Sequence, residues 1–497
     1  MKTIFAKSVS GRHAENLVLE PGENAPRAAD MLPAELLRKQ APRLPECSEL
    51  DVVRHFTALS RRNYSVDANF YPLGSCTMKY NPKFTEQVAA LPGFTRLHPM
   101  LAQLGRGAGC VQGALQVLYD AERWLCELTG MKAFTLQPMA GANGEFTGVK
   151  LIAAYHKARG RKRTRMLIPD SAHGTNPASA VLAGFEIVNI ESRDGMVDPQ
   201  ALARAIAAHP DDVAGLMMTC PNTLGLMETH LAEIVEELRK VDALLYYDGA
   251  NMNAIMGKMR VGDVGFDVVH LNVHKTLSTP HGGGGPGAGP VGVSERLVPY
   301  LPAPRVEHRA DDSYYVNFDL PQSIGYIGPF YGSFGVLAKA LAYMMRLGGN
   351  GLTRASEYAV LNANYLRKRL EDVLDIPFDR ICAHEFVASA PEGLRALDIA
   401  KGLLDRGIHA PTIYFPLIVK ECLMAEPTET ESKETLDEYV DALREIVAEG
   451  REHPEKLAAA PVNLPVRRLD ETAAARNMIL TEDMALRRRF VPDPPGG

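Results

Sequence analysis

Long apolar runs and an excess of charge of one sign are both missing from this chain of 497 residues. No stretch approaches the ~20 consecutive apolar residues that a membrane-spanning helix requires. Residues 1–10 also lack the apolar core of a secretory signal peptide. The net charge of -6 argues against nucleic acid or an anionic membrane as the main partner. We therefore expect a cytoplasmic protein whose partners include neither nucleic acid nor membrane.

Cysteine is scarce, and its spacing is not that of a metal site. The seven cysteines form no CxxC pair and no zinc-binding pattern. They are Cys47, Cys76, Cys110, Cys126, Cys220, Cys382 and Cys422. An odd, scattered set is typical of reduced thiols in a cytosol, so we expect no metal site.

The patterns that are present divide the chain into three regions. Residues 1–84 are proline-rich with short helical pieces, which predicts an N-terminal arm that packs on another surface; a poorly ordered tail is the alternative. Residues 85–330 alternate strand and helix patterns, which predicts a large α/β domain with a mainly parallel sheet. Residues 331–497 contain long amphipathic helices, which favours a smaller α+β C-terminal domain with a terminal extension.

A turn of small residues, Gln137 to Glu145, precedes a predicted helix. Its small residues would expose backbone N–H groups before the N-terminus of a helix that we expect to begin near Phe146, where the helix dipole favours an anion. The turn is therefore a candidate phosphate site, although an ordinary tight turn is the commoner meaning of such a pattern. It is not a P-loop, because no Gly-Lys-Ser/Thr follows.

Polar side chains follow two further predicted strands. His173 comes after the strand Arg165 to Pro169, where an imidazole could stack on a flat cofactor ring. The alternative is an incidental histidine in a helix-capping loop. Asn222 and Thr223 follow the strand Ala214 to Thr219 and supply hydrogen-bonding side chains. Ligands bind at the carboxyl ends of strands in sheets of this kind.

Asp248 and Lys275 end the next two predicted strands. Asp248 follows the apolar run Ala243 to Tyr247, where a carboxylate needs a partner such as a cationic pyridinium nitrogen. His274 and Lys275 follow another apolar run and precede the glycine-rich loop Pro280 to Pro290. A lone lysine in such a place is usually a solvated surface residue.

The strand-end residues together match what pyridoxal phosphate (PLP) requires. The aldehyde needs a lysine, the ring nitrogen an acidic partner, the ring face a stacking group and the phosphate a helix N-terminus. The set therefore predicts a PLP site in which Lys275 holds the cofactor.

Several segments closely resemble the glycine decarboxylase (P-protein) family of the glycine cleavage system. They are Tyr71 to Pro82, Ala140 to Glu145, Ser171 to Ala178, Asp248 to Asn251, His274 to Thr276, Pro280 to Pro290 and Glu426 to Ser432. The resemblance runs from about residue 60 to 435 and is to the C-terminal half of the long single-chain form. A chain of this length is therefore similar to subunit 2 of the two-subunit form.

The resemblance implies a fold, an activity and partners. It implies the fold-type I architecture of PLP enzymes, with a mainly parallel seven-stranded sheet in the large domain. It also implies decarboxylation of glycine with transfer of the aminomethyl group to the lipoyl group of H-protein, an oxidoreductase reaction that releases CO₂. Subunit 1, in an α2β2 assembly, and lipoylated H-protein are the implied protein partners.

The resemblance also implies roles for particular residues. Lys275 would form the Schiff base, with His274 beside it, Asp248 would pair with the ring nitrogen, and Ala250 would lie behind the ring. His173 would stack on the ring and take part in proton transfer, and the phosphate would bind at the turn formed by Gly141, Ala142 and Asn143. Thr223 is a looser match, near the ring hydroxyl, and Asn222 could serve instead. Candidates for the contact with the substrate carboxylate are Arg305, Arg309 and His384.

Two other functions stay open at this point. One is another fold-type I PLP enzyme acting on glycine or serine, against which the Glu426 to Ser432 segment and the glycine-rich loop argue. The other is a non-catalytic scaffold subunit, against which the presence of Lys275, Asp248 and His173 argues. Dependence on lipoylated H-protein and a yellow colour on adding PLP distinguish them.

Overall fold

The computed structural model describes residues 2–13, 27–40, 42–283 and 285–489. It divides into two compact units, Met1–Ser65 and Val66–Gly497. Pro21 and Pro26 of the proline-rich N-terminal region lie outside the described residues. Among the described residues, no helix is both long enough and apolar enough to cross a membrane.

In its described residues, the first unit contains short helices and one longer helix, α2. Its elements are η1 (Phe5–Lys7), α1 (Ala28–Met31), η3 (Ala34–Leu36) and α2 (Glu49–Ser60). Helix α2 begins with a capping box, in which the Ser48 and Asp51 side chains each accept a hydrogen bond from the backbone N–H of the other residue. Such caps stabilise a helix by about 1 kcal/mol.

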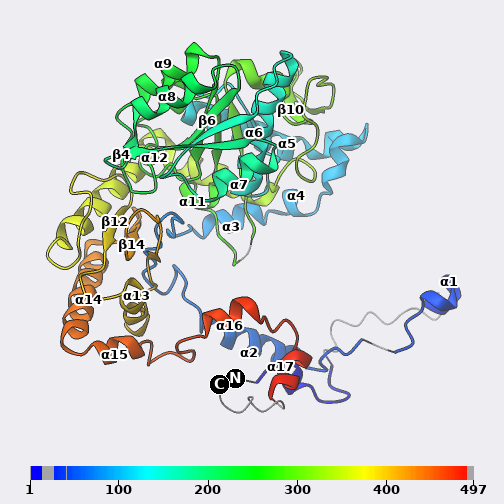
Figure 1. The fold of residues 1–497 in the computed structure, drawn as a ribbon. Helices are drawn as coiled ribbons and strands as arrows, with labels where there is room; N and C mark the ends of the chain where they lie inside the picture. Colours follow the sequence, from blue (N-terminus) through cyan, green and yellow to red (C-terminus); the bar gives the residue numbers. More distant parts are fainter. Residues whose placement is uncertain (1, 14–26, 41, 284, 490–497) are drawn as a thin grey trace. The chain divides into compact units, whose positions relative to one another are not determined.

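Within the described residues, seven strands of the second unit form one sheet in the order β1-β9-β8-β7-β6-β2-β3 (Figure 1). They are β1 (Ala133–Thr135), β2 (Arg165–Pro169), β3 (Glu186–Ile190), β6 (Val213–Thr219), β7 (Leu244–Gly249), β8 (Val268–Leu271) and β9 (Val291–Val293). Strands β3, β2, β6, β7 and β8 are parallel to one another, and β9 is antiparallel to both β8 and β1. The predicted mainly parallel seven-stranded sheet is confirmed.

Helices cover both faces of this sheet (Figure 1). They are α5 (Gln112–Thr129), α6 (Gly141–Ala158), α7 (Thr175–Leu182), α8 (Pro199–Ala208), α9 (Leu231–Lys240), α10 (Val261–Val264), α11 (Val273–Thr276) and α12 (Phe334–Arg369). One core cluster contains residues of α5, α8, α9 and α12, and the other residues of α6 and α7. In β7, Leu245 and Tyr247 lie in the first cluster and Tyr246 in the second, which is the two-residue alternation of a strand buried on both faces.

Short elements connect the sheet and its helices. They are α3 (Phe84–Ala89), α4 (Pro92–Thr95), η4 (Pro99–Gln103), η5 (Gly107–Val111), η6 (Glu295–Tyr300) and the strand pairs β4 (Ser192–Arg193) with β5 (Met196–Val197) and β10 (Arg305–His308) with β11 (Tyr314–Asn317). Helix α8 illustrates the local signals: Asp198 accepts a hydrogen bond from Gln200 N (3.0 Å), and Pro199 opens the helix.

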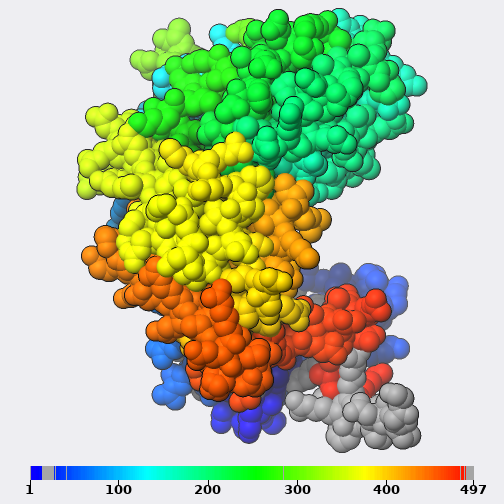
Figure 2. All heavy atoms as spheres, turned by 60° about the vertical axis from the view of Figure 1, so that its left-hand side comes forward, coloured from blue at the N-terminus to red at the C-terminus, as the bar shows by residue number. Residues whose placement is uncertain are grey.

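The C-terminal part forms its own small sheet and core, and Figure 2 shows the surface of this part in yellow to orange. Helix α12 contains a break at Gly348, where φ is 61° and ψ is -178°. The sheet order is β12-β14-β13, all antiparallel. The elements are β12 (Phe386–Ser389), α13 (Ala396–Asp405), β13 (Thr412–Ile413), β14 (Cys422–Ala425), α14 (Lys433–Glu452), α15 (Pro454–Ala459), α16 (Glu471–Arg476) and α17 (Glu482–Arg489).

Residues 66–83 cross between these parts of the second unit without forming a helix. Leu73 makes an antiparallel bridge to Ala425 at the end of β14. The Asn81 side chain donates a hydrogen bond to the carbonyl oxygen of Ser278 (3.0 Å), just after α11. This segment therefore connects the small sheet to the loop that carries Lys275.

Candidate functional site

A cavity of about 190 Å³ lies at the carboxyl ends of the central parallel strands. The lining residues that the sequence predicts are Gly141, Ala142, His173, Thr223, Asp248, Ala250 and Lys275. The rest of the lining is Ser75, Glu145, Thr175, Thr219, Pro221, Asn251, Asn272, His384 and Glu385. Strands β2, β6, β7 and β8 bring the predicted residues together because neighbouring parallel strands end at the same edge.

Asp248 lies near the end of β7 and is 2% exposed. Its Oδ2 accepts a hydrogen bond from Asn176 Nδ2 (2.9 Å), and its Oδ1 accepts one from the backbone N–H of Ala250 (3.1 Å). His270 Nε2 lies 3.4 Å from Oδ1. Burial alone would raise the pKa of Asp248, but His270 and these hydrogen bonds hold it below its ordinary value. The cavity therefore presents a buried carboxylate that can stabilise a cationic group.

His173 is oriented by a short chain of hydrogen bonds. Its Nδ1 lies 2.8 Å from Thr175 Oγ1, and that hydroxyl donates to Glu145 Oε1 (2.8 Å). Glu145 Oε2 also accepts hydrogen bonds from Asn176 and Ser179 (3.2 Å each). The backbone N–H of Thr175 also donates to His173 Nδ1 (3.3 Å), so Thr175 occupies Nδ1 and leaves Nε2 free of this chain.

The turn before α6 offers backbone N–H groups to the cavity. The described residues supply no side-chain cap for the N-terminus of α6, whose N-cap is Ala140. A Cβ at Gly141 would lie 2.5 Å from Asn272 Oδ1, so a larger residue there would displace the Asn272 amide. An uncapped N-terminus of an 18-residue helix is suited to an anion.

Lys275 lies in the single turn of α11, directly after β8. Its Nζ donates a hydrogen bond to the carbonyl oxygen of Ser75. Ser75 and Thr77 have positive φ values of 67° and 45°, a region that residues with side chains rarely occupy. Tertiary contacts hold this turn in place, because the Thr77 hydroxyl donates to Glu426 Oε1 (2.7 Å).

Asn222 does not line the cavity. Its Nδ2 donates to the carbonyl oxygen of Gly195 (2.6 Å), and its Oδ1 accepts from the backbone N–H groups of Leu224 and Leu226 (3.0 and 3.2 Å). Thr223 does line the cavity, and its hydroxyl donates to the Ser171 carbonyl (2.8 Å). Of the two alternatives, the structure brings only Thr223 to the cavity.

Asn143 and His274 also lie outside the lining. Asn143 Oδ1 turns back to accept a hydrogen bond from the backbone N–H of Met139 (3.0 Å). The ring of His274 meets that of His281 edge-on, at 5.2 Å between centroids. Burial, with the charges of His281 and Lys275, lowers the pKa of His274 to about 4. His274 is therefore an uncharged neighbour of Lys275.

Ser75, Glu385 and Glu426 were not predicted as parts of the site. Ser75 and Glu426 lie in segments that resemble the P-protein family, but their residue types suggest no role. Glu385 follows His384 in the otherwise apolar stretch Ile381 to Val387. Two titratable residues within an apolar run could have indicated a buried polar site, since charged side chains are buried only where they have partners.

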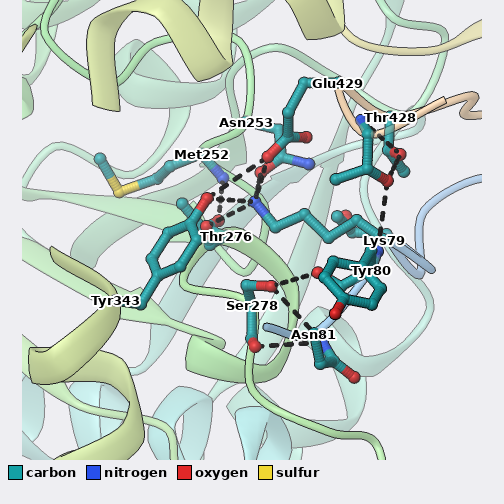
Figure 3. Close-up of polar contacts among 12 residues, drawn as sticks. Lys79, Tyr80, Asn81, Met252, Asn253, Thr276, Ser278, Tyr343, Thr428 and Glu429 are labelled. Atoms are coloured by element: carbon teal, nitrogen blue, oxygen red, sulfur yellow. Dashed lines mark hydrogen bonds and ion pairs between the residues drawn. The ribbon is translucent and has the colours of Figure 1, made fainter. Parts of the chain in front are cut away.

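A buried ion pair supports the loop that carries Lys275 (Figure 3). Lys79 Nζ lies 2.8 Å from Glu429 Oε1, with side-chain exposures of 1% and 10%. Figure 3 shows the same ammonium group donating to the Thr276 carbonyl (2.8 Å) and to the Tyr343 hydroxyl (3.5 Å). Burial alone would lower the pKa of Lys79, but the Glu429 carboxylate raises it above its ordinary value. The pair therefore anchors the residue after Lys275 to the C-terminal part.

Solved structures share this fold. Glycine decarboxylase (P-protein) of the glycine cleavage system, in inhibitor-bound form, superimposes with a TM-score of 0.69 and 20% identity, over 84% of this chain and 95% of that one. Glutamate decarboxylase from Lactobacillus brevis superimposes with a TM-score of 0.62 and 13% identity, over 85% and 97% of the two chains. These likenesses show that the chain has the fold-type I architecture, as predicted.

Sequence comparison narrows this class to one family. A protein of Caldanaerobacter subterraneus subsp. tengcongensis named "Probable glycine dehydrogenase (decarboxylating) subunit 2" is 54% identical over 96% of this chain and 98% of the relative. A protein of the same name from Halalkalibacterium halodurans is 55% identical over 90% of this chain and 92% of the relative. A family model described as "Glycine dehydrogenase, C-terminal domain" matches residues 355–464. The chain belongs to the family of glycine dehydrogenase (decarboxylating) subunit 2, which confirms the resemblance.

Proposed function

We propose that this chain decarboxylates glycine and transfers the aminomethyl group to the lipoyl group of H-protein. PLP is the cofactor, a related subunit 1 is the partner in an α2β2 assembly, and the complex acts in the cytoplasm. One observation carries the proposal: in a member of this family, Lys275, Asp248, His173 and the uncapped N-terminus of α6 converge on one cavity.

The residues of the cavity fit PLP. The α6 N-terminus suits a phosphate, Asp248 suits a cationic ring nitrogen and Lys275 suits an aldehyde. Two polar atoms of the lining, Thr219 Oγ1 and Asn272 Oδ1, are buried and have no hydrogen-bond partner among the described residues. Such unpaired groups are uncommon in folded proteins, and a polar ligand would pair with them.

The bound cofactor would supply an electron sink for the pair released when the C–COO⁻ bond of glycine breaks. Lys275 would hold the cofactor through Nζ, and that amine, when free, would be available to carry a proton. Asp248, fixed by Asn176 and the Ala250 N–H, keeps the ring nitrogen protonated. His173, oriented through Thr175 and Glu145, would stack on the cofactor ring and offer Nε2 for proton transfer.

The proposed function assigns a role to each of the three regions that the sequence patterns indicate. Residues 85–330 hold the cofactor, residues 331–497 form the smaller domain with its extension, and residues 1–84 form an arm that packs on subunit 1. Leu50, Val53 and Phe56 of α2 support a docking role, since each is more than half exposed. Residues 66–84 of the arm lie in the second compact unit.

A Lys275→Ala exchange tests the proposal. The chain is co-purified with subunit 1, loaded with PLP and assayed for glycine-dependent exchange of labelled bicarbonate, with and without lipoylated H-protein. We expect the wild type to need H-protein, Lys275→Ala to lose at least about 10³-fold in rate, and the 60% exposed Lys132→Ala to behave as wild type. Exchange that persists in Lys275→Ala, or that ignores H-protein, would contradict the proposal.

A further inference from the structure

The cavity lacks the side chain that usually binds a substrate carboxylate. None of the described residues that line it is an arginine, and its one lysine is Lys275. Arg305 is paired with Glu122 (2.8 Å), and the guanidinium of Arg309 lies 4.0 Å from the ring centre of Tyr315. Of the three candidates for the carboxylate contact, only His384 reaches the cavity wall.

His384 and Glu385 form a buried polar pair in that wall, immediately before β12. They are 2% and 3% exposed. Glu385 Oε2 accepts a hydrogen bond from the backbone N–H of Ser75 (2.7 Å), while Glu385 Oε1 lies 3.9 Å from His384 Nε2. Neither ring nitrogen of His384 has a hydrogen-bond partner within the part of the chain that the structure describes. The two ring nitrogens of His384 are therefore available to hydrogen-bond a ligand in the cavity that Lys275 also lines.

Both side chains are uncharged near neutral pH. Burial, reinforced by the nearby carboxylate of Glu426, raises the pKa of Glu385 to about 8. Burial lowers the pKa of His384. Glu426 itself accepts hydrogen bonds from Thr77, Asn251 and Asn253. Because these donors already point at Glu426, the His384, Glu385 and Glu426 group is poorly suited to a metal ion.

We propose that the Glu385 carboxyl and the His384 imidazole form the subsite that receives the carboxylate of glycine, acting as neutral hydrogen-bond donors where other enzymes use arginine. This inference rests on the proposed function. The carboxylate loses its charge as CO₂ leaves, so a bidentate arginine would stabilise the ground state more than the transition state. Neutral hydrogen-bond donors recognise the carboxylate but stabilise the charged ground state less, so they add less to the activation barrier of decarboxylation.

The titratable groups that face Glu385 are Glu426, Lys275, His384, Cys76, Cys382 and Cys422. Burial raises the pKa of each of the three thiols, to about 12 for Cys382 and Cys422. The thiols therefore stay neutral while Glu385 ionises. As the pH rises through about 8, Glu385 becomes an anion and repels the substrate carboxylate.

The test compares two ligands that differ by the carboxylate. Glycine and methylamine are titrated into the PLP-loaded complex with subunit 1, without H-protein, and binding is followed by the visible absorbance. Glu385→Leu and His384→Phe should weaken glycine binding by about ten- to a hundredfold and leave methylamine binding within about twofold. Glu385→Gln should keep glycine binding but lose the decline above pH 8 in the glycine-to-methylamine affinity ratio. His230→Gln, at a 37% exposed side chain, is the matched control.

Equal weakening of both ligands, or unchanged glycine binding, would overturn the subsite. If the Leu and Phe variants do not fold, the Glu385→Gln profile decides, because a ratio that still declines above pH 8 also overturns it. A wild-type complex without bicarbonate exchange counts against the proposed function instead. If the wild-type complex is active and the variants leave the glycine-to-methylamine affinity ratio unchanged, only the subsite is refuted.

Discussion

The cavity has two polar walls that are built in different ways. The strand-end wall consists of lining residues that lie on strands of the large sheet or on the segments and helices that follow them: Glu145, His173, Thr219, Thr223, Asp248 and Lys275. The crossing wall consists of Ser75 and Glu385, and the buried contacts of Lys79, Glu426 and Glu429 support it. It joins segments that are distant in the chain: Ser75 contacts Glu385 across 310 positions, and Lys79 contacts Glu429 across 350. The carboxylates of the strand-end wall accept hydrogen bonds from hydroxyl, amide and backbone N–H groups, with His270 3.4 Å from Asp248. The crossing wall is supported instead by a buried cation–anion pair. The first is therefore suited to electrostatic control of a cofactor, and the second to holding separate segments together.

Asp248→Asn should have the largest effect, and the effect should be on catalysis. The amide has nearly the same shape but cannot stabilise a cationic ring nitrogen, so we expect bicarbonate exchange to fall by roughly 10²- to 10⁴-fold. Circular dichroism should show an unchanged fold. Asp312→Asn, at a 94% exposed side chain, is the control. A rate within a few-fold of wild type would remove Asp248 from its proposed role.

Lys79→Met should act on stability, because it leaves Glu429 buried without its partner. We expect denaturant unfolding of the full chain to show a loss of about 3–5 kcal/mol. Lys83→Met, at a 59% exposed side chain, should cost at most about 1 kcal/mol. The double variant Lys79→Met with Glu429→Leu should recover much of the loss. Equal losses at Lys79 and Lys83 would refute a structural role for the buried pair.

Glu385→Gln should change how stability depends on pH. The pKa of Glu385 is raised from 4.5 to about 8 in the folded chain, so the folded state binds more protons between these values. Its contribution to stability is then fully present below about 4.5 and is lost as the pH rises through about 8. Relative to wild type, the melting temperature of Glu385→Gln should rise by a few degrees across this window. A constant difference in melting temperature would contradict the raised pKa.

Two threonines of the strand-end wall should give the smallest effects. Thr223→Val removes the hydrogen bond to the Ser171 carbonyl and should cost about 1 kcal/mol of unfolding free energy. Thr219→Val should be neutral in the cofactor-free chain, because Thr219 Oγ1 has no partner among the described residues. If Thr219 pairs with PLP, Thr219→Val should weaken PLP binding in a fluorescence titration. Unchanged PLP affinity would exclude that contact.

The two walls differ in how far the sequence predicts them. Strand and helix periods place His173, Thr223, Asp248 and Lys275 at strand ends, and a parallel sheet brings such ends to one edge whatever the details of packing. The choice between Thr223 and Asn222 was not predictable, because it depends on which side chain the loop uses for its own hydrogen bonds. His274 is next to Lys275 in sequence but turns away from the cavity, which the backbone of α11 decides.

The sequence by itself determined the class of sheet, the order of the strand-end residues and the family, because these depend on local periodicity and contiguous segments. The tertiary structure alone decided the crossing wall. Nothing near Lys79 in the chain indicates Glu429 as its partner, and nothing near Glu385 indicates the Ser75 amide or the Glu426 charge. These contacts form only when the chain folds. The Glu429 carboxylate then keeps Lys79 charged in spite of its burial, whereas burial keeps Glu385 protonated below about pH 8.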